Sequence, residues 1–374
     1  MPENSARIRV LMLSKALVVG SYQRKAELIA ATPEVELTVV VPPMWKDTRG
    51  ELALECAHTD GYQLAIEPMR FNGNFHLHYY PGLARCIAEV RPDIVHIDEE
   101  PYNYASYHAM RIAKRAGAKT LFFSWQNIYR KYPTPFSWME RAVLKSSDYA
   151  IAGTQEAAEV WRRKGYAGPM AVIPQFGVDP ELFAAVVSPR QSEIFNIGYA
   201  GRLVEEKGLD ILIRAMARVP GQTHLMLAGD GPQRGELQRL AGLHNIGGSV
   251  EVLSSIPSTE MPNFYHKLDA VILPSLTQPN WKEQFGRLLI EAMACGIPVI
   301  GSNSGAIPEV IGDAGIIVQE GDIDALRAAL TSLVEHPRLR QQLAEAGRKR
   351  VLEHFTQAQI AAQTVDVYRK MAMT

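Results

Sequence analysis

The sequence predicts an α/β protein made of two Rossmann-like domains, each with a doubly wound parallel sheet, facing a central cleft. Three observations predict this fold class. The chain has 374 residues, which exceeds the usual size of a single hydrophobic core. Short apolar, β-branched runs alternate with segments of helical period, as in repeated βαβ units. The twelve runs are too many for one ordinary sheet, so we divide them between two domains.

The candidate strands are short and almost continuously apolar, which is typical of parallel strands buried on both faces. Six lie in the first half, at residues 8–13, 36–42, 93–98, 119–125, 149–154 and 170–175. Six lie in the second half, at residues 195–201, 223–229, 250–255, 269–275, 298–303 and 315–318. Segments with the period of an amphipathic helix lie between them, for example 102–117 and 208–219.

The least patterned stretch is 183–193, and we place the linker there. This predicts an N-terminal domain over 1–187 and a C-terminal domain over 188–356. In doubly wound sheets, ligands bind beyond the carboxyl ends of the strands. Candidate functional residues are therefore expected in the loops that follow the predicted strands.

Composition excludes several classes of function. The net charge is −1 at pH 7, so no overall basic field predicts nucleic-acid binding. The three scattered cysteines, Cys56, Cys86 and Cys295, predict reduced thiols, and their spacing fits no zinc site. The apolar opening is interrupted by Lys15 and predicts a buried strand and its loop rather than a membrane span. We expect a cytoplasmic protein, with contact to the inner face of the membrane left open.

The segment from Gly198 to Met216 combines a strand end, a loop with two cations and an amphipathic helix. Arg202 and Lys207 lie five residues apart in this loop. Arginine can bind a diphosphate with two hydrogen bonds, while lysine adds a point charge. The alternative is a solvated loop in which Lys207 pairs with Glu205 or Glu206.

The segment from Trp281 to Gly305 contains two carboxylates, Glu283 and Glu291, eight positions apart. We expect a helix to begin near Phe285, so that its first amides can bind an anion or a sugar hydroxyl. These amides are those of Phe285, Gly286, Arg287 and Leu288. Glu283 precedes them, and Glu291 lies about 10–12 Å further along the helix. This spacing matches the length of a nucleotide sugar, although two exposed glutamates on an ordinary helix are the simpler alternative.

Taken together, "GRLVEEKG", "AGDGP" and "EQFGRLLIEAMACGIPVIGSNSGAIPEVIGDAG" resemble the retaining GT-B glycosyltransferases of family 4. The family signature is a glutamate, seven residues and a second glutamate, which Glu283 and Glu291 match. The resemblance implies that Arg202 and Lys207 hold the donor diphosphate. It also implies that Glu283 and the following amides hold the sugar and that Glu291 holds the ribose. A C-terminal helix, 357–374, would return to the first domain.

Two positions fit the family pattern less well. Gly20 lies after the first strand, where the family has a glycine-rich loop near the diphosphate, but a plain strand-to-helix turn explains it equally well. Many relatives have a Thr-x-His where this chain has Ser124-Trp125-Gln126. Gln126 would then orient substrate without exchanging protons. Alternatively, Gln126 and Asn127 cap the next helix.

Acidic and histidine side chains at the end of the strand 93–98 are candidates for acceptor binding. His96 and Asp98, with the two glutamates that follow, could bind acceptor hydroxyls. A metal site is not expected, because no second histidine has ligand spacing. The "DID" at 322–324 is expected to cap a helix rather than to bind a metal. Aromatic and basic residues alternate along 127–145, which can indicate contact with anionic lipid, but a wall of the acceptor site with ordinary core is the favoured interpretation.

These features predict a retaining transferase that moves a sugar from a nucleotide diphosphate to a hydroxyl acceptor. The acceptor is a saccharide, a lipid-linked molecule or a small molecule, and family habit favours UDP over GDP or ADP. Glu283 and Glu291 lie too far apart for the two-carboxylate chemistry of retaining glycosidases, which predicts front-face transfer without a metal or other cofactor. A sugar-nucleotide 2-epimerase and a non-catalytic sensor of nucleotide sugars are the alternatives.

Overall fold

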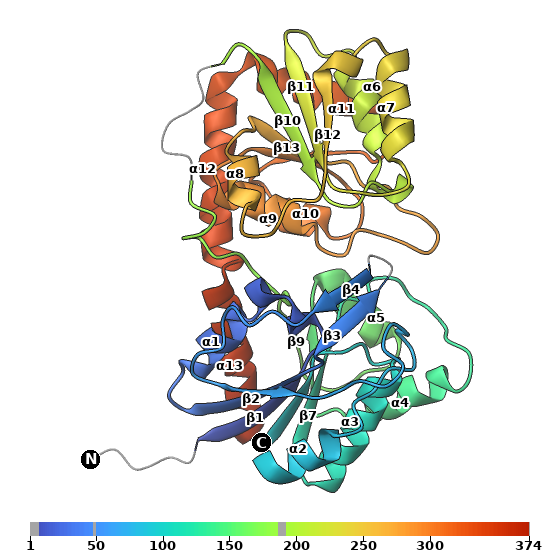
Figure 1. Ribbon diagram of the computed structural model, residues 1–374, viewed down its shortest axis with the longest axis vertical. Helices are drawn as coiled ribbons and strands as arrows, with labels where there is room; N and C mark the ends of the chain where they lie inside the picture. The colour runs from blue at the N-terminus through green and yellow to red at the C-terminus, as the bar shows by residue number, and fades with distance from the viewer. Residues whose placement is uncertain (1–6, 48–49, 186–191, 374) are drawn as a thin grey trace. The chain divides into compact units, whose positions relative to one another are not determined.

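The computed structural model describes residues 7–47, 50–185 and 192–373 (Figure 1). The chain divides into two units. The first comprises residues up to Phe176 together with the segment from Gln357 onward, and the second comprises Gly177–Thr356. Each unit contains a parallel sheet with helices on both faces, so the predicted α/β class and the two Rossmann-like sheets are confirmed.

The first unit is organised around a seven-stranded sheet in the order β5-β2-β1-β6-β7-β8-β9, in which every pairing is parallel. Its strands, in chain order, are β1 Ile8–Leu13, β2 Val35–Val41, β5 Gln63–Ile66, β6 Ile94–Ile97, β7 Lys119–Ser124, β8 Tyr149–Ala152 and β9 Met170–Val172. Its α-helices are α1 Arg24–Ala30, α2 Leu83–Val90, α3 Tyr104–Arg115, α4 Phe136–Ser146, α5 Gln155–Arg163 and α13 Gln357–Met373.

Alternate side chains of β1 enter two different hydrophobic cores. Val10 and Met12 pack in a core with residues of α1 and α13. Leu11 and Leu13 pack in a second core with residues of α2, α3 and α4. Because successive side chains of a strand point to opposite faces, a strand between two helical layers must be apolar throughout. This explains why the strand is apolar without alternation from Val10 to Leu13, whereas Arg9, near its start, is partly exposed and pairs with Asp93.

The second unit has a six-stranded parallel sheet in the order β12-β11-β10-β13-β14-β15. Its strands are β10 Phe195–Ala200, β11 Thr223–Ala228, β12 Val250–Leu253, β13 Ala270–Leu273, β14 Val299–Ser302 and β15 Ile316–Val318. Its α-helices are α6 Leu209–Met216, α7 Arg234–Leu243, α8 Met261–Tyr265, α9 Arg287–Ala294, α10 Ile307–Ile311, α11 Ile323–Glu335 and α12 Pro337–His354.

All twelve predicted strands are present, and three further strands were not predicted. The missed elements are β5 and the antiparallel hairpin of β3 Met44–Asp47 and β4 Gly50–Ala53. The first unit ends at Phe176, eleven residues before the predicted boundary at 187. Residues beyond Phe176 contact the second unit's own helices, because the Val178 amide donates to Phe355 O (2.9 Å) and Arg348 Nη1 donates to Phe183 O (3.4 Å). Within the described ranges, no helix combines the length and apolar character needed to cross a membrane.

Helix α13 returns to the first unit and packs against α1 and β6. Its Tyr368 hydroxyl lies 2.7 Å from His96 Nδ1, and both side chains are fully buried. Burial, with Lys25 nearby, holds the pKa of His96 well below its ordinary value, so the ring is neutral at pH 7. A buried polar pair of this kind is costly to break, because the remaining partner loses its hydrogen bond without regaining water.

We therefore expect Tyr368→Phe to lower the free energy of unfolding by about 1–3 kcal/mol. Urea denaturation followed by circular dichroism measures the change. Tyr104→Phe, at a half-exposed tyrosine of α3, is the matched control and should change stability by less than about 0.5 kcal/mol. Equal stability of Tyr368→Phe and the parent chain would contradict the structural role of this hydrogen bond.

Candidate functional site

The candidate donor site lies where the strand order of the second unit reverses, between β10 and β13. The loop after β10 carries Arg202 and Lys207, and the loop after β13 carries Glu283. Loops that leave such a reversal point run in opposite directions and open a crevice at the carboxyl edge of the sheet. The fold thus places the predicted cations and the predicted carboxylate in two neighbouring loops.

Lys207 and Glu283 form a largely buried ion pair. Lys207 Nζ lies 2.6 Å from Glu283 Oε2, and the two side chains are 14% and 9% exposed. Ser275 Oγ donates to the same carboxylate oxygen at 2.9 Å. The Lys207 ammonium also lies over the Trp281 ring, 4.9 Å from its centroid. Lys207 therefore pairs with Glu283 across 76 residues of sequence, rather than with Glu205 or Glu206.

The backbone around this ion pair is packed too closely for ordinary side chains. A Cβ at Gly305 would lie 2.1 Å from the Glu283 carbonyl oxygen, and Gly305 has φ +52°. A Cβ at Gly208, which has φ +62°, would lie 2.2 Å from the Pro274 carbonyl oxygen. The Leu276 amide donates to Glu206 O at 2.8 Å. These contacts fix the two loops relative to each other and hence the positions of Lys207 and Glu283.

Arg202 is the more exposed of the two predicted phosphate ligands. Its Nη2 lies 3.4 Å from Glu206 Oε1, and half of its side chain is accessible to solvent. Its backbone is fixed, because its carbonyl accepts a hydrogen bond from the Tyr199 hydroxyl at 2.9 Å. The guanidinium is therefore carried on an ordered loop and is accessible to an anion.

Glu291 lies inside α9 and is buried, so it is not an exposed glutamate on an ordinary helix. Its Oε2 accepts a hydrogen bond from the Tyr265 hydroxyl at 2.8 Å, and its Oε1 lies 2.7 Å from Arg287 Nε. Burial and the nearby Glu291 carboxylate raise the pKa of Tyr265 well above its ordinary value, so Tyr265 keeps its proton. Tyr265 had no signal in the sequence, because it reaches Glu291 from α8 through the tertiary structure.

The predicted start of the helix near Phe285 is wrong by two residues. Helix α9 begins at Arg287, and Gly286 precedes it with φ +78° and ψ +56°. The left-handed backbone conformation is adopted readily only by glycine. Gly286 therefore sets where the helix begins. The amides of Arg287 and Leu288 remain in the first turn, whereas Phe285 and Gly286 lie outside the helix.

The first unit has a polar network at its own reversal point, between β1 and β6. Ser14 Oγ donates to Asp98 Oδ2 at 2.5 Å, and Gln175 Nε2 lies 2.9 Å from both Asp98 oxygens. Lys15 forms an ion pair with Glu99. Although burial alone would raise the pKa of Glu99, Lys15 and His78 lower it to about 2. Asp98, by contrast, is buried with its pKa raised, despite the neighbouring Lys25.

The other predicted acceptor residues occupy different environments. Gln126 Nε2 donates to Ile128 O at 2.9 Å, and Asn127 Nδ2 donates to Glu156 Oε2 at 3.2 Å. Neither residue caps a helix, because α4 begins at Phe136 after Pro135. The His96 ring is fully buried on Tyr368, which argues against direct contact between this ring and an acceptor.

Gly20 is required by close packing. Its amide donates to Glu55 Oε2 at 2.6 Å, and a Cβ on Gly20 would lie 2.7 Å from Ala57 Cβ. The Gly20 amide thus already donates its hydrogen bond to a carboxylate within the protein. A packing role explains the glycine without a ligand, and phosphate contact at this loop stays a prediction.

The Asp322 side chain accepts a hydrogen bond from the Ala325 amide at 2.8 Å and caps α11. The prediction that "DID" is a helix cap is confirmed. Among the residues that the structure describes, no group of three His, Cys, Asp or Glu side chains is placed to hold a metal ion.

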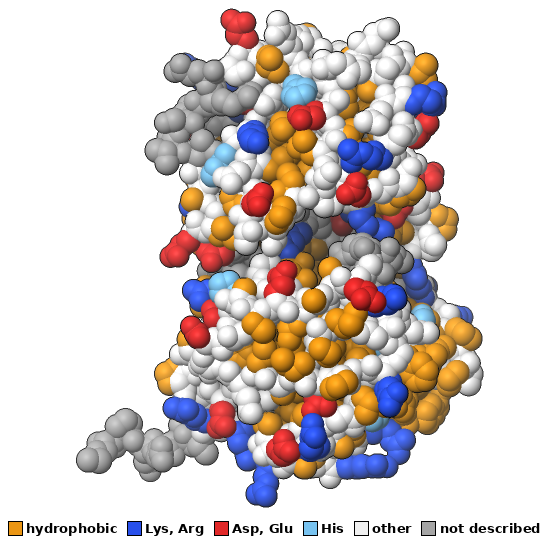
Figure 2. All heavy atoms as spheres, in the orientation of Figure 1, with side chains coloured by type: hydrophobic (Ala, Val, Ile, Leu, Met, Phe, Trp, Pro, Cys, Tyr) orange, Lys and Arg blue, Asp and Glu red, His pale blue; other side chains and the backbone are white. Residues whose placement is uncertain are grey.

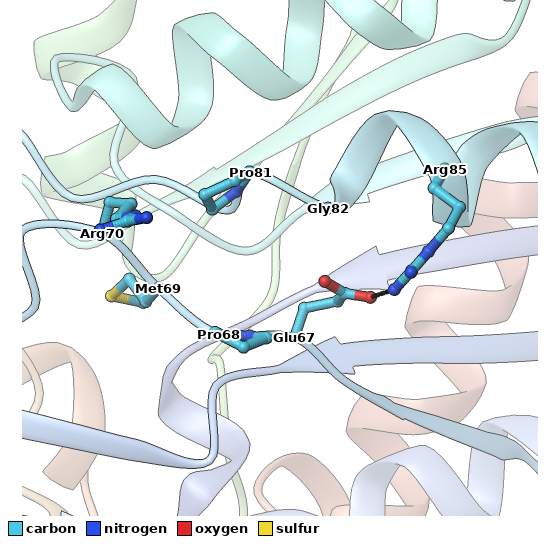
Figure 3. Close-up of a pocket in the computed structure, with 7 residues that line it drawn as sticks. All are labelled: Glu67, Pro68, Met69, Arg70, Pro81, Gly82 and Arg85. Carbon is cyan, nitrogen blue, oxygen red and sulfur yellow. Dashed lines mark hydrogen bonds and ion pairs between the residues drawn. The ribbon is translucent and has the colours of Figure 1, made fainter.

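A cavity of about 510 Å³ in the first unit lies apart from the predicted site residues (Figure 3). It is bordered by Pro68, Met69, Arg70 and Pro81 and by the ion pair of Arg85 Nη2 with Glu67 Oε1 (2.6 Å). A Cβ at Gly82 would lie 1.9 Å from Glu67 Oε2, so this carboxylate already fills the space beside the start of α2.

Comparison with known proteins shows the family to which the chain belongs. The model of glycosyl transferases group 1 matches residues 185–350, and that of Glycosyltransferase Family 4 matches residues 30–182. A GDP-mannose-dependent alpha-(1-6)-phosphatidylinositol monomannoside mannosyltransferase from Mycolicibacterium smegmatis is 33% identical over 268 residues, which are 65% of this chain and 68% of that protein. The chain belongs to the family 4 glycosyltransferases. This confirms the resemblance and the predicted enzyme class.

Other relatives of this family 4 member are matched over shorter stretches. MMP alpha-(1->4)-mannosyltransferase from Mycolicibacterium hassiacum is 34% identical over 206 residues, 53% of this chain. The match spans about half, 48%, of that relative's length. Among solved structures, a glycosyltransferase from Rickettsia africae aligns with TM-score 0.76, 18% identity and 98% and 99% coverage. Sucrose-phosphate synthase from Thermosynechococcus elongatus aligns with TM-score 0.72, 22% identity and 98% and 100% coverage. At these identities the structures establish the GT-B fold.

The close approach at Gly305 generates a prediction. Gly305→Ala should displace the Glu283 carbonyl and lower the stability of the second unit by about 1–3 kcal/mol. Thermal unfolding measures the change. Gly248→Ala, where a Cβ would have no neighbour within 4 Å, is the matched control. Equal melting temperatures for the two variants would show that the Glu283 loop is not held as described.

Proposed function

We propose that the chain transfers a hexose from a nucleotide-diphosphate sugar to a hydroxyl acceptor with retention of configuration and without a metal. The observation that carries the proposal is the Lys207–Glu283 pair at the β10/β13 reversal point. It joins a cation suited to a diphosphate with a carboxylate suited to sugar hydroxyls, in a member of a sugar-transferring family. The acceptor is expected to bind the first unit, where Asp98 and Gln126 are candidates.

Each donor-site residue has a chemical role in this proposal. The Lys207 ammonium has three N–H donors, of which one points to Glu283, so the others can bind phosphate oxygens. Arg202 can add two parallel hydrogen bonds. Both cations then stabilise the negative charge that develops on the leaving diphosphate, while that diphosphate accepts the proton of the acceptor hydroxyl. The bond to the leaving oxygen breaks and the bond to the acceptor oxygen forms on the same face of the sugar.

The remaining contacts bind the two ends of the donor, the transferred sugar and the ribose. Glu283 accepts hydrogen bonds from the transferred sugar, together with the amides that follow it. Glu291 accepts hydrogen bonds from the ribose, with Tyr265 and Arg287 holding its orientation. The M. smegmatis relative is named as GDP-mannose-dependent, which makes GDP-mannose the first donor to test. The preference for UDP stays a prediction from family habit.

Replacing either cation should reduce turnover, and Lys207→Ala should also lower stability because it leaves the buried Glu283 carboxylate without its partner. We expect Arg202→Ala and Lys207→Ala each to lower kcat by about 10²- to 10³-fold, the usual effect of removing one preorganised charge-stabilising group. Release of the nucleotide diphosphate in the presence of acceptor measures turnover. Arg218→Ala, which removes an exposed arginine that pairs with Asp324, is the control and should retain activity. Near-normal activity of both variants would contradict the diphosphate assignment.

The reaction itself is tested with a panel of nucleotide sugars. Donor at about 100 times its dissociation constant should stabilise the chain by about 2.7 kcal/mol. Nucleotide release that requires an acceptor, with the anomeric configuration retained by NMR, is the expected result. Consumption of donor without acceptor would favour an epimerase, binding without turnover would favour a sensor, and inversion would contradict the front-face mechanism.

A further inference from the structure

Five aromatic rings form a continuous series across the first unit. Their order is Phe71, Tyr79, Tyr104, Tyr107 and Trp138, with successive centroids 6.4, 5.3, 6.4 and 5.0 Å apart. The rings at the two ends are the most exposed, with Phe71 at 64% and Trp138 at 51%. The series joins the loop before α2 to helices α3 and α4, so these three segments share one surface.

This surface also exposes large apolar side chains beside the rings. Phe75 and Leu77 lie in the same loop as Phe71 and are 49% and 40% exposed. Hydrophobic side chains gather over the part of the first unit that contains α3 and α4, with Lys and Arg among those nearby (Figure 2). Contiguous exposed apolar area of this kind marks an interaction surface rather than ordinary exposure.

The loop before α2 and the segments around α3 and α4 carry an excess of positive charge. Residues 68–81 contain one Lys or Arg, residues 104–115 contain three and residues 128–147 contain four, and all eight are exposed. The one acidic residue among these segments, Glu140, is buried and paired with Lys164. Lys114 is partly neutralised by Asp148, which lies just outside them. The complete chain, by contrast, has 39 basic and 40 acidic residues.

This combination fits a lipid surface better than a protein. Protein interfaces are depleted of lysine at their centres, whereas membrane-binding surfaces combine tyrosine, tryptophan and aliphatic side chains with lysine and arginine. Exposed aliphatic Leu77 can enter the boundary between headgroups and acyl chains. The cations then face anionic headgroups, which attract them over about one Debye length.

We propose that the face formed by residues 68–81, 104–115 and 128–147 docks on an anionic membrane surface, with Phe71 and Trp138 entering the headgroup region. This docking is independent of the donor chemistry. It gives the aromatic and basic segment at 127–145 a role in lipid contact, which the sequence left as the less favoured interpretation.

The proposal is tested by co-sedimentation of the full chain with vesicles. Vesicles of phosphatidylglycerol and phosphatidylcholine should bind the chain at least tenfold more tightly than phosphatidylcholine alone, and 1 M salt should weaken the binding. Phe71→Ser combined with Trp138→Ser should weaken it at least tenfold. Leu243→Ser, at a similarly exposed residue of α7 in the second unit, is the matched control and should bind normally. Arg141→Glu should weaken binding, whereas Arg218→Glu in the second unit should not.

A second measurement does not depend on how the serine variants fold. Brominated lipids should quench part of the tryptophan fluorescence of the parent chain, and Trp138→Phe should abolish that part. Equal binding to neutral and anionic vesicles, absence of binding, or quenching unchanged in Trp138→Phe would overturn the proposal. Binding of the same face to single-stranded RNA, without binding to vesicles, would assign it to nucleic acid instead.

Discussion

The buried ion pair between Lys207 and Glu283 is the constraint on which the candidate donor site depends. Both groups lie out of water, where an unpaired charge is costly, so neither is expected to be stable in this position without the other. The pair requires the loops after β10 and β13 to lie against each other. Glycines at positions 208 and 305 allow the two loops to approach this closely, because any Cβ there would collide with a backbone carbonyl oxygen. Backbone packing and electrostatics thus specify the same loop arrangement.

The two units repeat this arrangement. In each unit, a lysine that follows the central strand pairs with a glutamate that follows the strand on the other side of the reversal point. These pairs are Lys15 with Glu99 in the first unit and Lys207 with Glu283 in the second. In the first unit the pair is part of a larger polar network around Asp98 and Gln175. Parallel sheets place such residues together because the carboxyl ends of all strands share one edge.

Much of the fold could be predicted from the sequence because the central strands are buried on both faces and therefore apolar throughout. The missed strands are at the periphery. β5 and β4 contain half-exposed and exposed residues, so their sequences lack that signal. The start of α9 was misplaced because the left-handed conformation of Gly286 depends on local packing. Glu283 and Glu291 could be found from their spacing, whereas Ser275 and Tyr265 could not, because they reach these carboxylates only through tertiary contacts.

The most direct test of the central claim compares binding of a nucleoside diphosphate and of the corresponding nucleotide sugar by isothermal titration calorimetry. The donor is the nucleotide sugar that the chain accepts. Lys207→Met should weaken the binding of both ligands more than tenfold, because both contain the diphosphate. Glu283→Gln keeps a hydrogen-bond acceptor for Lys207. It should weaken binding of the nucleotide sugar and leave binding of the nucleoside diphosphate unchanged. If Glu283→Gln lost the same factor of affinity for both ligands, the assignment of Glu283 to the sugar would be contradicted.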